Sequence, residues 1–119
     1  MDDEEMIREF AAELLNELGY TVALARDGEE AIRLYKAAQE SGTPFSAVLM
    51  DITIPGGMGG KEAIKEILKL DADAKVIVSS GYAKDPIMSN YRRYGFSGVV
   101  PKPYNIEELS QELHRVLTG

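Results

Sequence analysis

The sequence contains no cysteine and only one histidine, His114. Without cysteine, neither a disulfide framework nor a thiolate metal site can form, and one histidine is too few for the multi-histidine zinc sites. No apolar run approaches the roughly 20 residues that a membrane span needs. No basic and then apolar leader precedes the first predicted helix, so we expect a cytoplasmic protein without membrane contact.

Basic residues are also scarce, because 13 Lys and Arg stand against 20 Asp and Glu, a formal net charge of −7. This balance disfavours direct binding of nucleic acid through the general surface. Four of the acidic residues are consecutive, at positions 2–5. A short acidic run usually marks a solvated helix start, which the helix dipole favours. That explanation suits Glu4 and Glu5 better than Asp2 and Asp3.

Hydrophobic spacing predicts alternating helices and strands. Apolar residues at three- and four-residue spacing indicate helices, whereas short apolar and β-branched runs indicate strands. The expected helices cover residues 4–18, 28–40, 61–70, 86–94 and 106–117, and the expected strands cover 20–25, 45–50, 75–78 and 96–100. This alternation predicts a parallel sheet with helices on both faces. We find no repeat and no linker, so we expect one domain, residues 1–119.

Polar residues follow three of the predicted strands. Asp51 comes directly after the strand at 45–50, Ser80 follows the next strand, and Lys102 follows the last. In open parallel sheets, ligands bind outside the carboxyl ends of the strands. Phosphoryl transfer to a carboxylate needs an ionised nucleophile, oxygen ligands for a divalent cation, and donors for the phosphoryl oxygens. These three residues, with Asp2 and Asp3, supply every part.

Each residue also has an ordinary structural explanation. An Asp after a strand is more often a turn former or a helix cap, and a Ser-Ser-Gly stretch such as 79–81 is more often a plain turn. A lysine before a proline, as at Lys102, is ordinarily a surface residue. Asp2 and Asp3 alone fit an acidic helix start. Their joint placement at successive strand ends nevertheless favours a chemical role.

The order of these motifs resembles a response-regulator receiver domain of two-component signalling, over nearly the whole chain. The matching stretches are Asp2-Asp3-Glu4, Met50-Asp51 with Pro55 and Gly59-Gly60, Val78-Ser79-Ser80-Gly81, and Lys102-Pro103. The resemblance implies an α/β, doubly wound five-stranded parallel sheet, the flavodoxin-like receiver fold with strand order 2-1-3-4-5. Residues 51–64, 76–82 and 95–104 are also similar to receivers fused to hybrid sensor histidine kinases.

The resemblance implies that Asp51 is the phosphoacceptor and that a histidine kinase or a histidine phosphotransfer domain is the donor. Ser80 and Lys102 would contact the phosphoryl group, and the peptide bond between Lys102 and Pro103 would be cis. The first helix and the Lys102-Pro103 loop would form the docking surface. A receiver catalyses its own phosphorylation and dephosphorylation, so no conventional multiple-turnover activity is expected.

The resemblance also implies a site for Mg²⁺ or Mn²⁺. Its ligands would be Asp2, Asp3, Asp51 and the backbone carbonyl of Thr53, with Asp3 binding directly and Asp2 largely through water. The positions that commonly tune dephosphorylation would be Thr53, Met58 or its neighbours, and Tyr82.

The chain departs from the family pattern in two places. The family has a hydrophobic strand before the acidic pair, the central strand of the sheet, whereas here the pair follows Met1 directly. We expect either a longer natural chain or a strand supplied by another molecule, through strand exchange or a dimer, because the neighbouring strands would otherwise lack partners. The Met1 ammonium would then lie near the carboxylates and could compete with the metal.

The second departure is Val99, three residues before Lys102, where many receivers carry an aromatic residue whose rotation reports phosphorylation. We therefore expect movement of the Ser80 loop, rather than a ring flip, to carry the signal.

Two other functions compete with phosphorelay signalling. A phosphatase of the haloacid dehalogenase type also uses a strand-end Asp and Mg²⁺, but it needs a second Asp two residues later, where this chain has Thr53. A pseudo-receiver would keep the fold as a protein-interaction module without phosphotransfer. The presence of Asp51, Ser80 and Lys102 argues against it.

Overall fold

The computed structural model describes residues 1–81 and 85–118. Its described strands form one parallel sheet in the order β1-β2-β3, with β1 at Val48–Asp51, β2 at Val76–Ser80 and β3 at Gly98–Pro101. The register pairs Asp51 with Ser79 and Ser80 with Pro101. The carboxyl ends of all three strands therefore meet at one edge, where the sequence places its polar residues.

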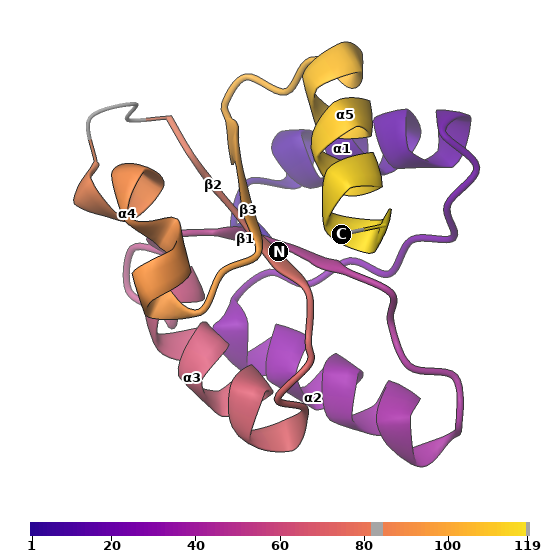
Figure 1. Ribbon diagram of the computed structural model, residues 1–119, viewed down its shortest axis with the longest axis vertical. Coiled ribbons are helices and arrows are strands. Elements are labelled where there is room, and N and C mark those ends of the chain that lie inside the picture. Colours follow the sequence, from indigo (N-terminus) through magenta and orange to yellow (C-terminus); the bar gives the residue numbers. More distant parts are fainter. Residues whose placement is uncertain (82–84, 119) are drawn as a thin grey trace.

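Helices lie on both sides of this sheet (Figure 1). The side with α1 and α5 is opposite the side with α2 and α3. The helices are α1 (Glu5–Glu17), α2 (Gly28–Glu40), α3 (Gly60–Leu70), α4 (Pro86–Ser89) and α5 (Ile106–Thr118), and a 3₁₀ helix, η1, covers Tyr91–Tyr94. The coarse prediction of an α/β fold with a parallel sheet is confirmed.

The sheet separates two groups of buried apolar side chains. On the side of α2 and α3 the buried group includes Tyr35, Met50 and Ile64. On the side of α5 it includes Leu109 and Val100. Continuous burial of residues 76–80 is what a parallel strand covered on both faces requires. β2 is thus the central strand of the observed sheet, and its last residues are held firmly at the polar edge.

Side-chain hydrogen bonds cap the start of α2. The Asp27 side chain accepts a hydrogen bond from the backbone N–H of Glu30 at 2.9 Å, and the Glu30 side chain accepts one from the N–H of Arg26 at 3.0 Å. These reciprocal bonds satisfy donors that a helix start leaves without intrahelical partners.

The predicted strand at residues 20–25 is wrong for this structure, since the segment has no strand assignment. A strand needs a neighbour for its ladder, and of the residues that the structure describes, Met1 and Asp2 connect this segment to β1. The N–H of Asp2 donates to the carbonyl of Ala25 at 3.1 Å, and the N–H of Asp51 donates to the carbonyl of Met1 at 3.0 Å. Two residues therefore join two segments that are otherwise apart. Among the described residues the sheet has three strands, so the five-stranded order expected from the resemblance is not confirmed.

The predicted helix at residues 86–94 is divided. α4 ends at Ser89, Asn90 has φ −116° and ψ 29°, and η1 follows. Asn90 leaves the helical region, so the α-helical bonding cannot continue through it.

The outer edge of β3 is closed by a side chain rather than by a strand. The Glu112 carboxylate accepts a hydrogen bond from the backbone N–H of Val99 at 2.8 Å. Arg115 holds that carboxylate at 2.7 Å and also donates to the carbonyl of Ser97 at 3.0 Å. Edge strands are commonly protected by charged groups in this manner.

No helix within residues 1–81 and 85–118 is long and apolar enough to cross a membrane.

Gly59 is required by close backbone packing beside the end of β1. A Cβ atom at this position would lie 2.2 Å from the carbonyl oxygen of Ile52. We expect Gly59→Ala to lower the free energy of unfolding by about 1–3 kcal/mol, because the backbone at 52–53 must shift. Chemical denaturation measures this loss. Gly81→Ala is the control, since its Cβ would meet no atom within 4 Å; equal losses in both variants would contradict the assignment.

Candidate functional site

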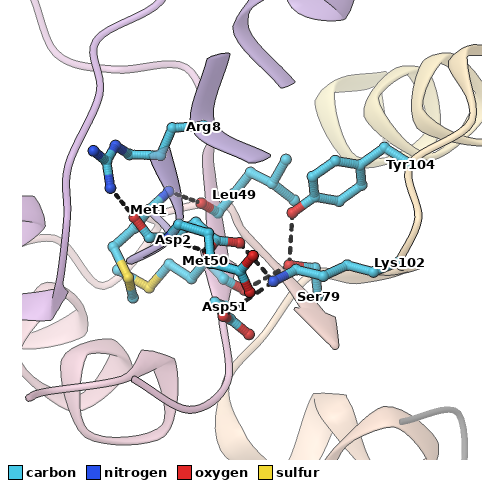
Figure 2. A network of polar contacts seen from close by, with 10 residues as sticks. Met1, Asp2, Arg8, Leu49, Met50, Asp51, Ser79, Lys102 and Tyr104 are labelled. Atoms are coloured by element: carbon cyan, nitrogen blue, oxygen red, sulfur yellow. Dashed lines mark hydrogen bonds and ion pairs between the residues drawn. The ribbon is translucent and has the colours of Figure 1, made fainter. Parts of the chain in front are cut away.

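The side chain of Asp51 lies at the end of β1, in direct contact with Lys102 (Figure 2). The Lys102 ammonium donates to Oδ2 of Asp51 at 3.0 Å and to Oδ2 of Asp2 at 2.5 Å. The side chains of Asp51 and Lys102 are each 14% exposed. One cation thus lies between two carboxylates that are far apart in the sequence, at an edge that solvent can still reach.

The acidic pair has one buried and one exposed member. Asp2 is 3% exposed, and its carbonyl accepts a hydrogen bond from Arg8 at 2.8 Å. Asp3 is exposed. Carboxylate oxygens of Asp2, Asp3 and Asp51 nevertheless lie within 4.8 Å of one another. The structure therefore brings together the three acidic residues that the sequence singled out.

Ser80 lies beside Lys102. The backbone N–H of Lys102 donates to the carbonyl of Ser80 at 3.0 Å, and Ser80 is buried. The peptide bond between Lys102 and Pro103 is cis, as expected. The residues at the ends of β1, β2 and β3 thus converge at one edge, as the sequence analysis expected.

The remaining predicted positions lie around this edge. Thr53 is exposed, two residues beyond Asp51, and Met58 is partly buried. Tyr82 lies outside the described residues. Val99 packs against the group of buried side chains near α3. The Met1 amino group donates to the carbonyl of Leu49 at 2.6 Å, and the cation between the carboxylates is Lys102.

The charges of the site act on one another. Burial raises the pKa of the Asp51 carboxyl; the hydrogen bond from Lys102 opposes this shift, and the charges of Asp2 and Asp3 add to it. Burial acts to lower the pKa of Lys102, but its hydrogen bonds to Asp2 and Asp51 outweigh burial and raise it. The pKa of Asp51 thus rises chiefly through burial, and the pKa of Lys102 rises through its two carboxylate partners. A second cation would relieve the excess negative charge.

Two residues at the back of the site were not singled out by the sequence analysis. The hydroxyl groups of Ser79 and Tyr104 form a buried hydrogen bond of 2.8 Å, and the Ser79 hydroxyl also donates to the carbonyl of Met50 at 3.3 Å. Burial raises the pKa of Tyr104 to about 12, so its hydroxyl stays protonated at neutral pH. Tyr104 follows Lys102 by two residues, and the bond ties this loop to β2. The one feature of the sequence that could have indicated a role for Tyr104 is its position two residues after Lys102.

The donor set fits a hard divalent cation. Mg²⁺ prefers carboxylate and carbonyl oxygens and keeps several waters, and Asp2, Asp3 and Asp51 offer oxygens close enough to share one ion. The partial exposure of the site leaves room for water ligands. The acidic cluster could therefore bind Mg²⁺ or a similar ion.

These features define a class of signalling protein, and comparisons with known proteins agree. A family model described as the response regulator receiver domain matches residues 1–114. The chemotaxis protein CheY of Thermotoga maritima is 32% identical over 117 residues, which cover 98% of this chain and 92% of CheY. The chain belongs to the response regulator receiver domain family.

Two further relatives extend the comparison. The sensor kinase CckA of Brucella abortus is 31% identical over 98% of this chain, which spans only 12% of that kinase. The receiver domain of the sensor histidine kinase PA1611 of Pseudomonas aeruginosa, solved with a magnesium ion in its active-site cleft, has a TM-score of 0.85 at 25% identity. That alignment covers 100% of this chain and 94% of the other. Both small receivers and receivers within kinases thus resemble this chain.

The raised pKa of Asp51 predicts a pH-dependent stability of the metal-free protein. A carboxyl whose pKa is higher in the folded than in the unfolded state binds its proton more tightly when folded, so its contribution is present at acid pH and is lost as pH rises through the folded-state pKa. We expect Asp51→Asn to be more stable than the parent at neutral pH in EDTA, with the difference shrinking toward acid pH. Denaturation at several pH values measures it. A difference that does not change with pH would contradict the assignment, and Asp73→Asn, with an exposed side chain, is the control.

The bond between Ser79 and Tyr104 can be tested by a double-mutant cycle. We expect Tyr104→Phe to lower the free energy of unfolding by about 1 kcal/mol, because a buried hydrogen bond is lost. Ser79→Ala removes the same bond, so Tyr104→Phe should cost much less in the Ser79→Ala background. Additive losses in chemical denaturation would show that the two hydroxyls do not interact.

Proposed function

We propose that this chain is a phosphoacceptor domain of a two-component phosphorelay, which takes a phosphoryl group onto Asp51. The observation that carries the proposal is the contact between Asp51 and Lys102 at 3.0 Å, with two further carboxylates within 4.8 Å. An ionised carboxylate, an ammonium beside it and a set of hard oxygen ligands are the parts that phosphoryl transfer requires.

In the proposed step, a carboxylate oxygen of Asp51 attacks the phosphorus of a phosphohistidine. A phosphorus–oxygen bond forms, the phosphorus–nitrogen bond breaks, and the imidazole leaves with the electron pair. Lys102 moves its ammonium from the Asp51 carboxylate to a phosphoryl oxygen, and the Ser80 hydroxyl donates to another. Hydrolysis then restores the Asp51 carboxylate, because water attacks the acyl phosphate and releases inorganic phosphate. No multiple-turnover reaction is proposed.

The metal ligands in this proposal are Asp2, Asp3, Asp51 and the backbone carbonyl of Thr53. Bound Mg²⁺ or Mn²⁺ would offset the charge that develops on the phosphoryl oxygens. Asp2 is already paired with Lys102, whereas Asp3 is exposed, which supports direct binding through Asp3 and a less direct role for Asp2.

The proposed donor is a histidine kinase or a histidine phosphotransfer domain in the cytoplasm. The similarity to part of the sensor kinase CckA supports a place within a hybrid kinase, and the similarity over most of CheY supports an independent receiver equally well. The proposal includes the five-stranded order 2-1-3-4-5. It also includes signalling through movement of the Ser80 loop, because Val99 stands three residues before Lys102 in place of an aromatic residue.

Acetyl phosphate tests the proposal without a cognate kinase. With Mg²⁺, we expect the intact protein to gain the mass of one phosphoryl group, and Asp51→Asn to gain none. Asp3→Asn should need a much higher Mg²⁺ concentration, whereas Asp73→Asn should behave as the parent. Mass spectrometry under mild conditions measures the phosphoryl adduct. A Mg²⁺ titration followed by NMR measures the affinity for the metal.

Failure of the folded parent to gain the phosphoryl group, at saturating Mg²⁺, would favour a protein-interaction module without phosphotransfer. Repeated hydrolysis of small phosphoesters would favour a phosphatase.

A further inference from the structure

Two buried hydroxyl groups connect the loop after β3 to the residue that precedes Asp51 (Figure 2). The Tyr104 hydroxyl lies 2.8 Å from the Ser79 hydroxyl, which donates to the carbonyl oxygen of Met50 at 3.3 Å. A serine hydroxyl has a single proton, and here that proton is directed at the carbonyl, so Tyr104 is the donor in the bond to Ser79. Both residues are buried, and water therefore has little access to these groups.

Lys102 is anchored to β2 on both sides. Its own N–H donates to the carbonyl of Ser80 at 3.0 Å, and Tyr104, two residues later, bonds to Ser79. Successive residues of β2 thus hold the loop before and after the point where the Lys102 side chain leaves it. The backbone of Lys102 cannot shift unless one of these bonds breaks or β2 moves with it.

The Tyr104 side chain is fixed along its whole length. Its ring packs with Ile77 and Leu109 in the buried group between the sheet and α5. The next residue, Asn105, caps α5 by accepting hydrogen bonds at 2.8 and 3.2 Å from two backbone N–H groups of the first turn. Removal of the Tyr104 hydroxyl alone would leave these contacts in place and release only the bond to Ser79.

Phosphoryl transfer makes a strict demand on the Lys102 ammonium. In the resting site the ammonium lies 3.0 Å from Oδ2 of Asp51, and in the proposed step it moves to a phosphoryl oxygen. A donor lowers the barrier only if it already points to where charge develops, and a misplacement of about 1 Å can cost about 100-fold in rate. Lysine carries its charge on a long, flexible stem, so the ammonium is directed only if the backbone at the base of that stem is held.

We propose that Tyr104 is a positioning residue for phosphoryl transfer, whose hydroxyl bond to Ser79 holds the base of Lys102 so that the ammonium reaches the phosphoryl oxygens. This inference rests on the proposed function, because the reacting carboxylate is that of Asp51. The Tyr104 hydroxyl is engaged by Ser79, so Tyr104 acts through Lys102 rather than on the phosphoryl group itself.

The two directions of the reaction should respond alike. Uptake and hydrolysis both pass through a transition state with negative charge on the phosphoryl oxygens, and the Lys102 ammonium acts on that charge in both. Binding of Mg²⁺ depends on the carboxylates instead. Loss of the Tyr104 hydroxyl should therefore slow both steps without weakening the metal site.

The test compares Tyr104→Phe with the parent protein, with acetyl phosphate as the donor and Mg²⁺ at saturation. In this reaction an Asp51 oxygen attacks phosphorus, and acetate leaves with the electron pair. Mass spectrometry over time gives the rate constant of uptake and, after removal of acetyl phosphate, that of hydrolysis. We expect both to fall about threefold to tenfold in Tyr104→Phe, with the half-saturating Mg²⁺ concentration unchanged.

Tyr35→Phe is the matched control, because it makes the same chemical change elsewhere. Tyr35 is buried, and its hydroxyl donates to the Asp71 carboxylate at 2.8 Å. Asp71 follows α3 and precedes β2, whereas Asp51 stands at the carboxyl end of β1. Tyr35→Phe should therefore lose stability and keep both rate constants.

Two further measurements identify the route of the effect. Ser79→Ala removes the acceptor of the Tyr104 bond and should slow both steps as Tyr104→Phe does, and the double variant should be no slower than either single variant. In NMR of the metal-free parent, the two ε-methylene protons of Lys102 should have distinct shifts, because the ammonium is held between Asp2 and Asp51. This difference should narrow in Tyr104→Phe but not in Tyr35→Phe.

Four results would overturn the inference. Unchanged rate constants in Tyr104→Phe would do so and leave phosphoryl transfer to Asp51 intact. Equal slowing by Tyr35→Phe would reduce Tyr104 to a structural role. Slowing without a change at the Lys102 protons would exclude positioning of Lys102 as the cause. A folded parent that gains no phosphoryl group would overturn the proposed function itself, and the inference with it.

Discussion

Three carboxylates gathered at one edge of a sheet repel one another, and the ammonium of Lys102 is what allows them to be so close. Its contacts with Asp2 and Asp51 connect the amino-terminal segment, the end of β1 and the loop after β3. The same contacts hold Asp51, the proposed phosphoacceptor, and the Lys102 ammonium in place. The need to balance charge thus determines both the local geometry and its chemistry.

This arrangement depends on the sheet behind it. Strand register alone brings residues 51, 79, 80 and 101 to a common edge. Backbone bonding from Lys102 to Ser80 and the buried hydroxyl pair of Ser79 and Tyr104 then join the last loop to the central strand. A displacement of Lys102 toward a new partner would therefore be transmitted to β2 and to the start of α5.

The convergence of Asp51, Ser80 and Lys102 was predictable because strand ends in a parallel sheet must share an edge. The pairing of Asp2 rather than Asp3 with Lys102 was not, since it depends on which carboxylate the backbone buries. Residues 20–25 have strand-like composition, yet a strand exists only with a partner. Periodicity detects side-chain burial but not the presence of that partner. Likewise, nothing in the sequence around Ser79 reports a hydroxyl contact 25 residues away.

The carboxylate of Glu112, fixed by Arg115 against the last strand, has a consequence for assembly. It occupies the position where a strand from a neighbouring molecule would otherwise attach, and it places charge there. A second copy that added a strand to β3 would have to displace this charged side chain, which disfavours a continuous sheet across copies. The sheet is accordingly closed to further growth at the flank of β3.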